Sequence, residues 1–425
     1  QFDMFVAKLD PDGNWLWAVS GGSVYYDHSY GVSTDGAGNC YATGYFNGTA
    51  TFGPFTLTGP AFWGSIWVAK LDPAGNWLWA VSGGGPSTDG SESIATDSAG
   101  YSCITGYFEG TSTFGTHSVT SFGNNDILVA KLDPDGNWLW ASNAGGSFPE
   151  GGRSVAVDSD GKCYITGSFS SENAAFGTQI IHGDGWDYEV FAACLDGDGN
   201  WLWANGTTPL DYDDDSGEDI IPDGYGNCYI TGSINGTAIF GTTTLTSYGL
   251  SDIFVAKLDN TGNWVWAMQA GSASSSFGDA GTAIAIASDT HVLVSGSCSV
   301  NCVFGSITLT NYPMYANAFV ASLYDEVQNP VPGPVTLLSP ENGAMNLPLA
   351  GFDLTWEPDP NFGTPDHYEI YLADSPDQIY FQQFWICDEN HTNPVEEGMA
   401  FGTDETWYWT VVAVNDAGST PTSEI

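Results

Sequence analysis

The densest group of potential metal ligands in this 425-residue sequence lies at residues 211–219. Its carboxylates belong to Asp211, Asp213, Asp215 and Glu218. Oxygen ligands spaced two residues apart in a loop that contains glycine suit Ca²⁺, so calcium is the cofactor that this segment suggests. The spacing does not follow the register of an EF-hand loop. A solvated acidic loop is therefore the competing interpretation, and it is favoured.

Aromatic side chains offer a second chemistry, because their rings can stack on sugars. The motif Trp-x-Trp occurs five times, and both rings of each copy lie on one face of a strand. Because five copies share one structural position, packing between repeats is favoured over sugar binding. Aromatic residues in the variable loops are better candidates for an exposed ligand-binding surface. These are Trp63, Trp67, Trp186, Tyr25 and Tyr26.

No motif indicates a catalytic centre, and we predict a protein that is not an enzyme. The sequence has no Gly-x-Ser-x-Gly, His-Glu-x-x-His or phosphate-binding loop, and its six histidines are not in metal-binding spacing. A carboxylate pair of the glycosidase type cannot be located among 51 acidic residues. Cys298 and Cys302 could form a local disulfide in an oxidising compartment.

The charge of the chain excludes some partners. With 6 basic and 51 acidic residues, the formal net charge is −45. Nucleic acid and anionic membrane surfaces both require cationic patches, so neither is expected as a partner. The sequence also contains no apolar run of about 18 residues, which argues against insertion into a membrane. An acidic surface of this kind fits a secreted protein that could hold divalent cations.

The elements that carry these side chains repeat along the chain. The first Trp of each Trp-x-Trp copy stands at 15, 77, 138, 201 and 264, which gives steps of 62, 61, 63 and 63 residues. Such a period indicates an array of supersecondary units. One repeat, residues 92–143, predicts strands at 92–97, 101–108, 127–132 and 137–141 joined by short turns. Four antiparallel strands per repeat are typical of a propeller blade. The expected order from inside to outside is the order in the sequence.

The repeated motifs are Ile-Ala-x-Asp-x-x-Gly-x-Cys-Tyr-Ile-Thr-Gly and Phe-Val-Ala-Lys-Leu-Asp-x-x-Gly-Asn-Trp-Leu-Trp, with Phe-Gly between them. They resemble the SBBP-type β-propeller repeats of bacteria over residues 1–326. The resemblance implies an all-β propeller of five, or six, four-stranded blades. It also implies a large secreted or cell-surface protein without enzymatic activity, and it supplies no catalytic residues.

The period stops before residue 327, and a second domain is expected. Residues 327–334 form a Pro-rich linker. Residues 335–425 alternate with period two at 354–356, 368–372 and 407–414. This segment looks like an immunoglobulin-like β-sandwich of the fibronectin type III kind. It reads as incomplete at its C-terminal end, and the opening in mid-repeat suggests a piece of a longer precursor.

Three functions remain open from the sequence. The first is a structural or adhesion protein of the bacterial cell surface or extracellular space, with a propeller on a fibronectin-like stalk. The second is a carbohydrate-binding or carbohydrate-processing module. The third is a subunit of an extracellular filament or sheath that self-associates through strand edges. The expected partners are envelope or extracellular proteins or polysaccharides. Glycan binding separates the second from the first, and self-assembly separates the third.

Overall fold

The computed structural model describes residues 2–210, 213–274, 277–288, 291–310 and 316–324, and seven strands between 336 and 421. The chain divides into two compact units. The first contains Gln1–Ile286 and Leu293–Ser322, and the second contains Ala287–Val292 and Leu323–Ile425. Among the described residues no helix is long and apolar enough to cross a membrane.

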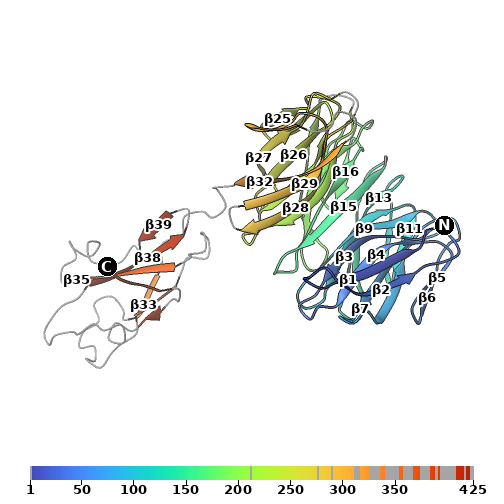
Figure 1. The fold of residues 1–425 in the computed structure, drawn as a ribbon, viewed down its shortest axis with the longest axis horizontal. Helices are drawn as coiled ribbons and strands as arrows, with labels where there is room; N and C mark the ends of the chain where they lie inside the picture. Colours follow the sequence, from blue (N-terminus) through green and yellow to red (C-terminus); the bar gives the residue numbers. More distant parts are fainter. Residues whose placement is uncertain are drawn as a thin grey trace. The chain divides into compact units, whose positions relative to one another are not determined.

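The first unit consists of antiparallel sheets that repeat the same four-stranded pattern (Figure 1). In each sheet the hydrogen-bonded order of the four strands follows the order of the sequence. The first complete sheet consists of β3 (His28–Thr34), β4 (Cys40–Phe46), β7 (Ser65–Leu71) and β8 (Trp77–Gly83), and the second of β9 (Asp89–Thr96), β10 (Ser102–Phe108), β13 (Asp126–Leu132) and β14 (Trp138–Gly145). The third consists of β15 (Glu150–Val157), β16 (Cys163–Phe169), β19 (Glu189–Leu195) and β20 (Trp201–Gly206). The fourth consists of β22 (Ser216–Pro222), β23 (Cys228–Ile234), β26 (Asp252–Leu258) and β27 (Trp264–Ala270).

Two partial sheets accompany the four complete ones. The hairpin of β1 (Met4–Leu9) and β2 (Trp15–Gly21) corresponds to the two outer strands of a blade. The sheet of β28 (Ala280–Ser288), β29 (His291–Cys298) and β32 (Asn317–Tyr324) corresponds to the three inner strands. The first unit is therefore an all-β, propeller-like array, and the predicted order of strands within a blade is confirmed.

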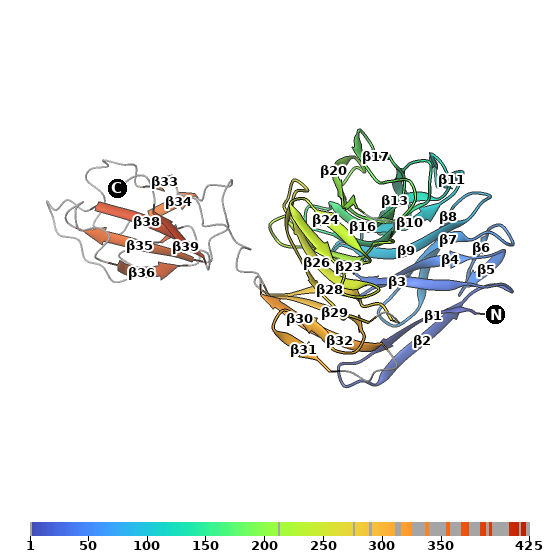
Figure 2. The same cartoon turned by 90° about the horizontal axis from the view of Figure 1, so that it is seen from above.

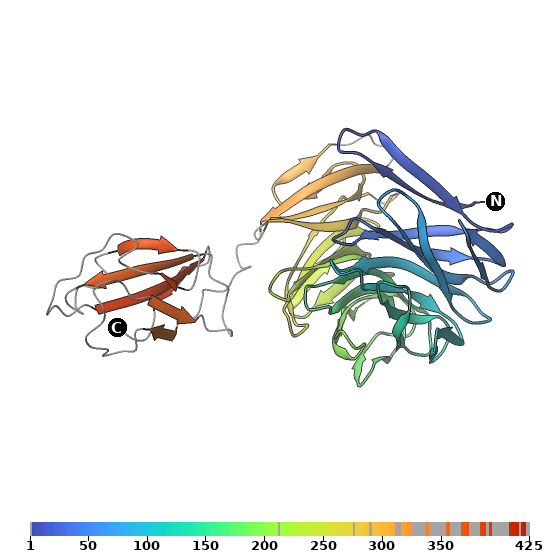
Figure 3. The same ribbon diagram turned by 90° about the horizontal axis from the view of Figure 1, so that it is seen from below.

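The first strand of each sheet lies towards the middle of the array. Figure 2 shows β3, β9 and β28 near the centre and β2, β8 and β20 at the periphery, and Figure 3 shows the same arrangement from the opposite side. The inner strands of successive sheets also contact one another, from β3 to β9, β9 to β15 and β15 to β22. The side chains of these inner strands therefore meet at one place.

Each inner strand contains a β-bulge, and the Gly of the repeated Thr-Gly dipeptide accommodates it. In the β15–β16 ladder Gly152 pairs with Gly167 and Ser154 with Thr166, so Arg153 is the bulge residue and pairs with no residue of β16. A β-carbon at Gly167 would overlap the carbonyl oxygen of Gly151 on the inner strand. The same overlap would occur at the equivalent glycines of the other sheets, which are Gly44, Gly106, Gly232 and Gly296. The glycine is therefore required by the close approach of two backbones.

The tight turns at the other end of the strands are stabilised by aspartate side chains. In the turn of residues 72–76, Asp72 Oδ1 accepts hydrogen bonds from the amides of Ala74 and Asn76, and Oδ2 accepts one from Asn76 Nδ2. Gly75 adopts a φ of 86°, in the left-handed region that glycine tolerates. The carboxylate of such a turn is already committed to backbone and amide donors, so the Asp-x-x-Gly-Asn segments are hairpin turns.

The second Trp of the first four Trp-x-Trp copies joins one blade to the next. Trp79 Nε1 donates to the carbonyl oxygen of Pro134 at 3.1 Å, and its ring covers Gly136 in the following turn. Trp17 and Trp140 make the same contacts with the turns that follow them. The first Trp of the last four copies instead packs on the Phe-Gly of a short hairpin between the second and third strands of its blade. Trp138, for example, packs on Phe114 in the hairpin of β11 (Thr111–Phe114) and β12 (His117–Thr120), with ring centroids 5.0 Å apart. The prediction that these tryptophans pack repeats together is confirmed.

Trp79→Ala is expected to lower the free energy of unfolding by about 3 kcal/mol, because it removes a large ring from a half-buried site between two blades. Leu78→Ala is the matched control, since the Leu78 side chain is 46% exposed on the opposite face of the same strand. Its effect should stay within about 0.5 kcal/mol. Chemical denaturation of both variants measures the difference. Equal losses would contradict the packing role.

The second unit contains two antiparallel sheets. One has the order β36 (Gln383–Cys387), β35 (His367–Ala373), β38 (Tyr408–Asn415) and β39 (Gly418–Pro421). The other has the order β33 (Thr336–Ser339), β34 (Leu354–Glu357) and β37 (His391–Thr392). The predicted linker at 327–334 lies outside the described residues.

The predicted disulfide is not formed in the described structure. Cys298 ends β29 and Cys302 begins β30 (Cys302–Phe304), and both side chains are buried as thiols. Burial raises the pKa of the Cys302 thiol well above its ordinary range, and the neighbouring Cys298 adds to this effect. The protonated state of Cys302 is therefore favoured, and both buried side chains pack as small apolar groups. A disulfide between them in an oxidising compartment stays a prediction.

Candidate functional site

The long connections between strands gather at one end of the blades, which we call the connector face. It comprises the segments 59–64, 121–125, 182–188 and 247–251, which lead into the third strand of a blade, and the loops between blades. Backbone hydrogen bonds join the two groups of segments. The amide of Glu150 donates to the carbonyl of Asn125 at 2.7 Å, and the amide of Asp215 donates to that of Tyr188. The tight aspartate turns lie at the opposite end of the same strands.

Each complete blade exposes an aromatic side chain at the same place on the connector face. The residues stand three or four positions before the third strand of their blade. They are Phe62 (80% exposed), Phe122 (60%), Trp186 (80%) and Tyr248 (59%). Large aromatic rings that remain in solvent at equivalent positions are not explained by core packing. We call these four residues the aromatic set.

The loop aromatics predicted from the sequence fall into three groups. Trp186 belongs to the aromatic set, Trp63 is its exposed neighbour beside Phe62, and Tyr26 is also exposed. Tyr25 is half-buried and packs edge-on against Phe62, with ring centroids 5.8 Å apart. The exposed positions of Trp63, Trp186 and Tyr26 are compatible with the predicted ligand-binding surface. Ligand binding there stays a prediction.

Trp67 does not belong to that surface. It lies within β7 and is completely buried in the core that surrounds Phe52, and its Nε1 donates to the carbonyl oxygen of His28 at 3.1 Å. The prediction that Trp67 lies in an exposed loop is therefore wrong. Repeat alignment places it at the position of Leu128 and Phe254, which are equally buried.

The predicted calcium ligands do not converge in the described structure. Asp211 lies outside the described residues. Asp215 is buried and Oδ1 accepts the amide of Asn235 at 2.8 Å, while Asp213 Oδ1 accepts from the side chain of the same asparagine. Glu218 Oε1 accepts from Ser216 Oγ at 2.6 Å. Among the described residues no three acidic, Cys or His side chains are grouped to hold a metal. Calcium binding here stays a prediction.

A different set of residues meets where the inner strands come together. The bulge residues of β3, β9, β15 and β22 are skipped by the strand ladder and stay exposed or half-buried. They are Tyr30, Glu92, Arg153 and Glu218. A bulge re-aims its side chain and frees it from pairing. One position of the repeat thus carries an aromatic, an acidic, a basic and an acidic side chain in successive blades.

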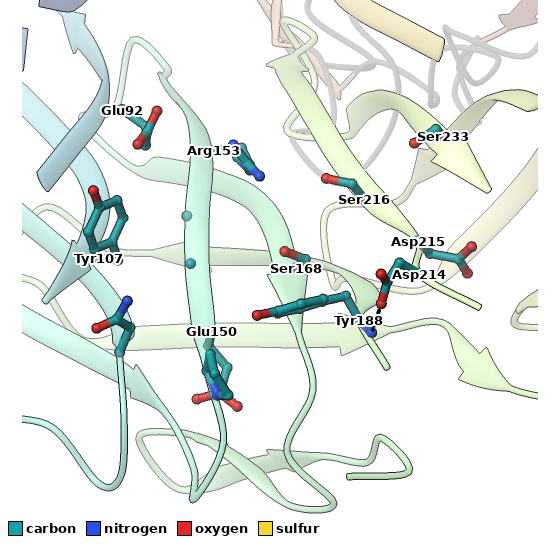
Figure 4. A pocket seen from close by; sticks show the side chains of 14 residues that line it. Glu92, Tyr107, Glu150, Arg153, Ser168, Tyr188, Asp214, Asp215, Ser216 and Ser233 are labelled. Carbon is teal, nitrogen blue, oxygen red and sulfur yellow. Dashed lines mark hydrogen bonds between the residues drawn. The ribbon is translucent and has the colours of Figure 1, made fainter. Parts of the chain in front are cut away.

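A cavity of about 480 Å³ lies beside these bulges, and we call it the inner pocket. Its walls include Glu92 and Arg153 from the inner strands, Tyr107 from β10, and Tyr188 and Asp214 from the connector face. Figure 4 shows these side chains around one space. The volume lies within the range of roughly 300–1,000 Å³ that is typical of small-molecule sites.

Arg153 and Glu92, which carry opposite charges in the inner pocket, do not form an ion pair with each other. Within the described chain, no hydrogen bond or ion pair joins the Arg153 guanidinium or the Glu92 carboxylate to a protein group. Burial raises the pKa of Glu92; the positive field of Arg153 opposes this shift and the charge of Glu218 adds to it. Arg153 also lowers the pKa of Tyr107 and Tyr188 against the effect of their burial. Arg153 is therefore electrostatically central to the pocket.

Sequence reasoning overlooked the inner pocket. A signal for it exists, because Arg153 is the only arginine of a chain with six basic residues. Its repeat position also differs in chemical type from one blade to the next, with Tyr30, Glu92, Arg153 and Glu218 in successive blades. A bulge position that accepts such different residues carries a side chain that the strand ladder does not constrain.

Comparisons with known proteins show little. No family model matches the chain. The uncharacterized WD repeat-containing protein L264 of Acanthamoeba polyphaga mimivirus is 30% identical over 116 residues, which is 25% of this chain and 8% of that protein. Among solved structures, Sqt1 from Chaetomium thermophilum has a TM-score of 0.31 at 12% identity and covers 95% of this chain and 98% of its own. A protein from Bacteroides caccae has a TM-score of 0.25 at 12% identity, with coverages of 62% and 89%.

Proposed function

We propose that the protein is a non-enzymatic protein of the cell surface or extracellular space that adheres to polysaccharide through the connector face. The aromatic set supports this proposal. One ring per complete blade remains exposed on that face, three or four residues before the third strand. Flat aromatic faces suit the apolar faces of sugar rings, and repetition around the array provides several weak contacts at once.

The charge of the chain narrows the class of polysaccharide. A net charge of −45 repels polyanions, and the five lysines do not offset it on the connector face. Lys70, Lys131 and Lys257 are buried within the sheets, and Lys70 Nζ lies 3.7 Å from Asp35. A neutral polysaccharide meets no such repulsion. Neutral polysaccharide is therefore the ligand class that fits the connector face.

The finer architecture belongs to this proposal. We infer that the sheets of the first unit form a ring of five or six blades of the SBBP type, with the β1–β2 hairpin and the β28–β29–β32 sheet as its partial members. The C-terminal strands would form a fibronectin type III-like stalk that spaces the propeller from its anchor.

The test is a pull-down with insoluble neutral polysaccharides, cellulose and chitin among them, and a glycan array. The chain should bind at least one neutral glycan, and Trp186→Ala combined with Phe122→Ala should lower the affinity about tenfold, since each stacked ring contributes on the order of 0.5–1.5 kcal/mol. Leu78→Ala combined with Leu139→Ala is the control, because both leucines are exposed on the outer Trp-x-Trp strands.

Two outcomes would contradict the proposal. One is the absence of binding to every neutral glycan tested. The other is equal loss of binding in the aromatic and the leucine variants. Release of reducing sugar from a bound glycan would instead support carbohydrate processing and overturn the non-enzymatic assignment.

A further inference from the structure

The inner pocket contains a positive and a negative group that do not neutralise each other. Arg153 comes from the bulge of β15 and Glu92 from the bulge of β9, the next inner strand. Opposite charges on adjacent flexible side chains would ordinarily approach to ion-pair distance. Here neither group makes an ion pair or a hydrogen bond with the described chain. The scaffold therefore leaves space between the two charged groups.

The surroundings favour a ligand that carries a negative group for Arg153 and a positive group for Glu92. A simple anion would meet Arg153 but also Glu92, Asp214 and the negative field of the whole chain. A simple cation would meet Glu92 but also the like charge of Arg153 in the same pocket. A molecule with a carboxylate and an ammonium group has no net charge and satisfies both side chains.

The remaining walls fit the body of such a molecule. Tyr107 and Tyr188 supply aromatic surface, and Ser168, Ser216 and Asn125 supply neutral polar groups. Tyrosine faces also attract an ammonium group through their ring electrons. The cavity of about 480 Å³ admits a ligand of amino-acid or short-peptide size.

We propose that the inner pocket binds a small zwitterion, with its carboxylate on Arg153 and its ammonium group on Glu92. The guanidinium offers two parallel N–H donors, which match the two oxygens of a carboxylate. The half-buried carboxylate of Glu92 accepts from the ammonium group and recovers the solvation that burial removed. This site is separate from the aromatic set and does not depend on polysaccharide binding.

Isothermal titration calorimetry with a graded series tests the proposal. The probes are glycine, β-alanine, 4-aminobutyrate and 6-aminohexanoate, whose two charged groups are progressively farther apart. Butyrate and butylamine each carry only one of the charges. At least one zwitterion should bind, and both single-charge compounds should bind about tenfold more weakly or worse, because each charge-assisted hydrogen bond is lost.

Variants identify the site. Arg153→Gln and Glu92→Gln should each lower the affinity for the best zwitterion about tenfold or more. Lys162→Gln is the matched control, because Lys162 pairs only with exposed Asp160 in a turn at the far end of the strands. Thermal unfolding confirms that the variants fold. Unchanged affinity in Arg153→Gln, equal binding of butyrate, or no binding of any zwitterion would overturn the proposal, whatever the chain does with polysaccharides.

Discussion

Gly167→Ala is expected to lower the free energy of unfolding by about 3 kcal/mol or more. The added methyl group would overlap the carbonyl oxygen of Gly151 and approach the amide of Arg153 to 3.0 Å. Both contacts are with backbone, so no side-chain rotation relieves them, and the inner strand must move. Overpacking of this kind costs about 1–3 kcal/mol where side chains can yield, and more where they cannot. Urea denaturation with tryptophan fluorescence measures the loss.

Gly151→Ala provides a control in the same pair of strands. A β-carbon at Gly151 would have no neighbour within 4 Å, and the backbone there does not require glycine. Its effect on stability should therefore remain within about 0.5 kcal/mol. If Gly167→Ala were as mild as Gly151→Ala, the close approach of β16 to the bulge of β15 would not be a determinant of the fold.

The protein is expected to be more stable at pH 5 than at pH 8. Burial is the main cause that raises the pKa of Asp89 and Asp252 to about 6 and that of Asp126 to about 7. Each group is protonated in the folded chain and ionised in the unfolded chain between its ordinary pKa of 3.8 and the raised value. Stability is therefore lost as the pH rises through about 6–7, by on the order of 1–3 kcal/mol per group relative to pH 5.

The aspartates of the tight turns oppose this trend only in stronger acid. Hydrogen bonds from the Asn76 side chain and backbone hold the pKa of Asp72 below its ordinary value, and Asn14 does the same for Asp10. Their contribution to stability is present above about pH 4 and is lost as the pH falls through the lowered values. The two groups of carboxylates together predict maximal stability in mildly acidic solution.

Asp126→Asn isolates one contribution. The amide keeps an acceptor for the Phe122 amide, which now donates to Asp126 Oδ2 at 2.8 Å, and it cannot ionise. The difference in unfolding free energy between pH 5 and pH 8 should shrink by on the order of 2 kcal/mol. Asp12→Asn removes the same charge from an exposed turn and should leave the difference unchanged. Stability that is flat or rising between pH 5 and pH 8 would contradict the assignment.

The strands and their order could be predicted because local sequence determines them. Trp-x-Trp alternation, the Asp-x-x-Gly-Asn turns and the period of about 62 residues all act within one repeat. The burial of Trp67 could have been predicted, because it directly precedes a Val-Ala-Lys-Leu copy as Leu128 and Phe254 do. Its contacts with Phe52 and His28 could not, because these residues belong to other strands. The loop-like composition of residues 61–64 suggested that Trp67 is exposed as well, but the loop ends where β7 begins.

The candidate sites divide in the same way. Exposure at Trp63 and Trp186 follows from their loops, but the exposure of Phe122 and Tyr248 before the third strand of their blades is seen only in the structure. The inner pocket escaped prediction because Arg153 and Glu92 are 61 residues apart and meet only through the contact of β9 with β15. The acidic run near 211–219 suggested a metal site because it is dense in sequence, yet Asp213 and Asp215 accept from Asn235 and Glu218 accepts from the hydroxyl of Ser216.

The bulges of the inner strands separate recognition from folding. A side chain that no ladder pair constrains can be exchanged without loss of a hydrogen bond in the sheet. Four such places are occupied by Tyr30, Glu92, Arg153 and Glu218. The side chains at these four places can therefore change while the strands that carry them stay the same. Related propellers with the same strands could thus differ entirely in ligand, and new specificities could be engineered by combinatorial substitution at these positions alone.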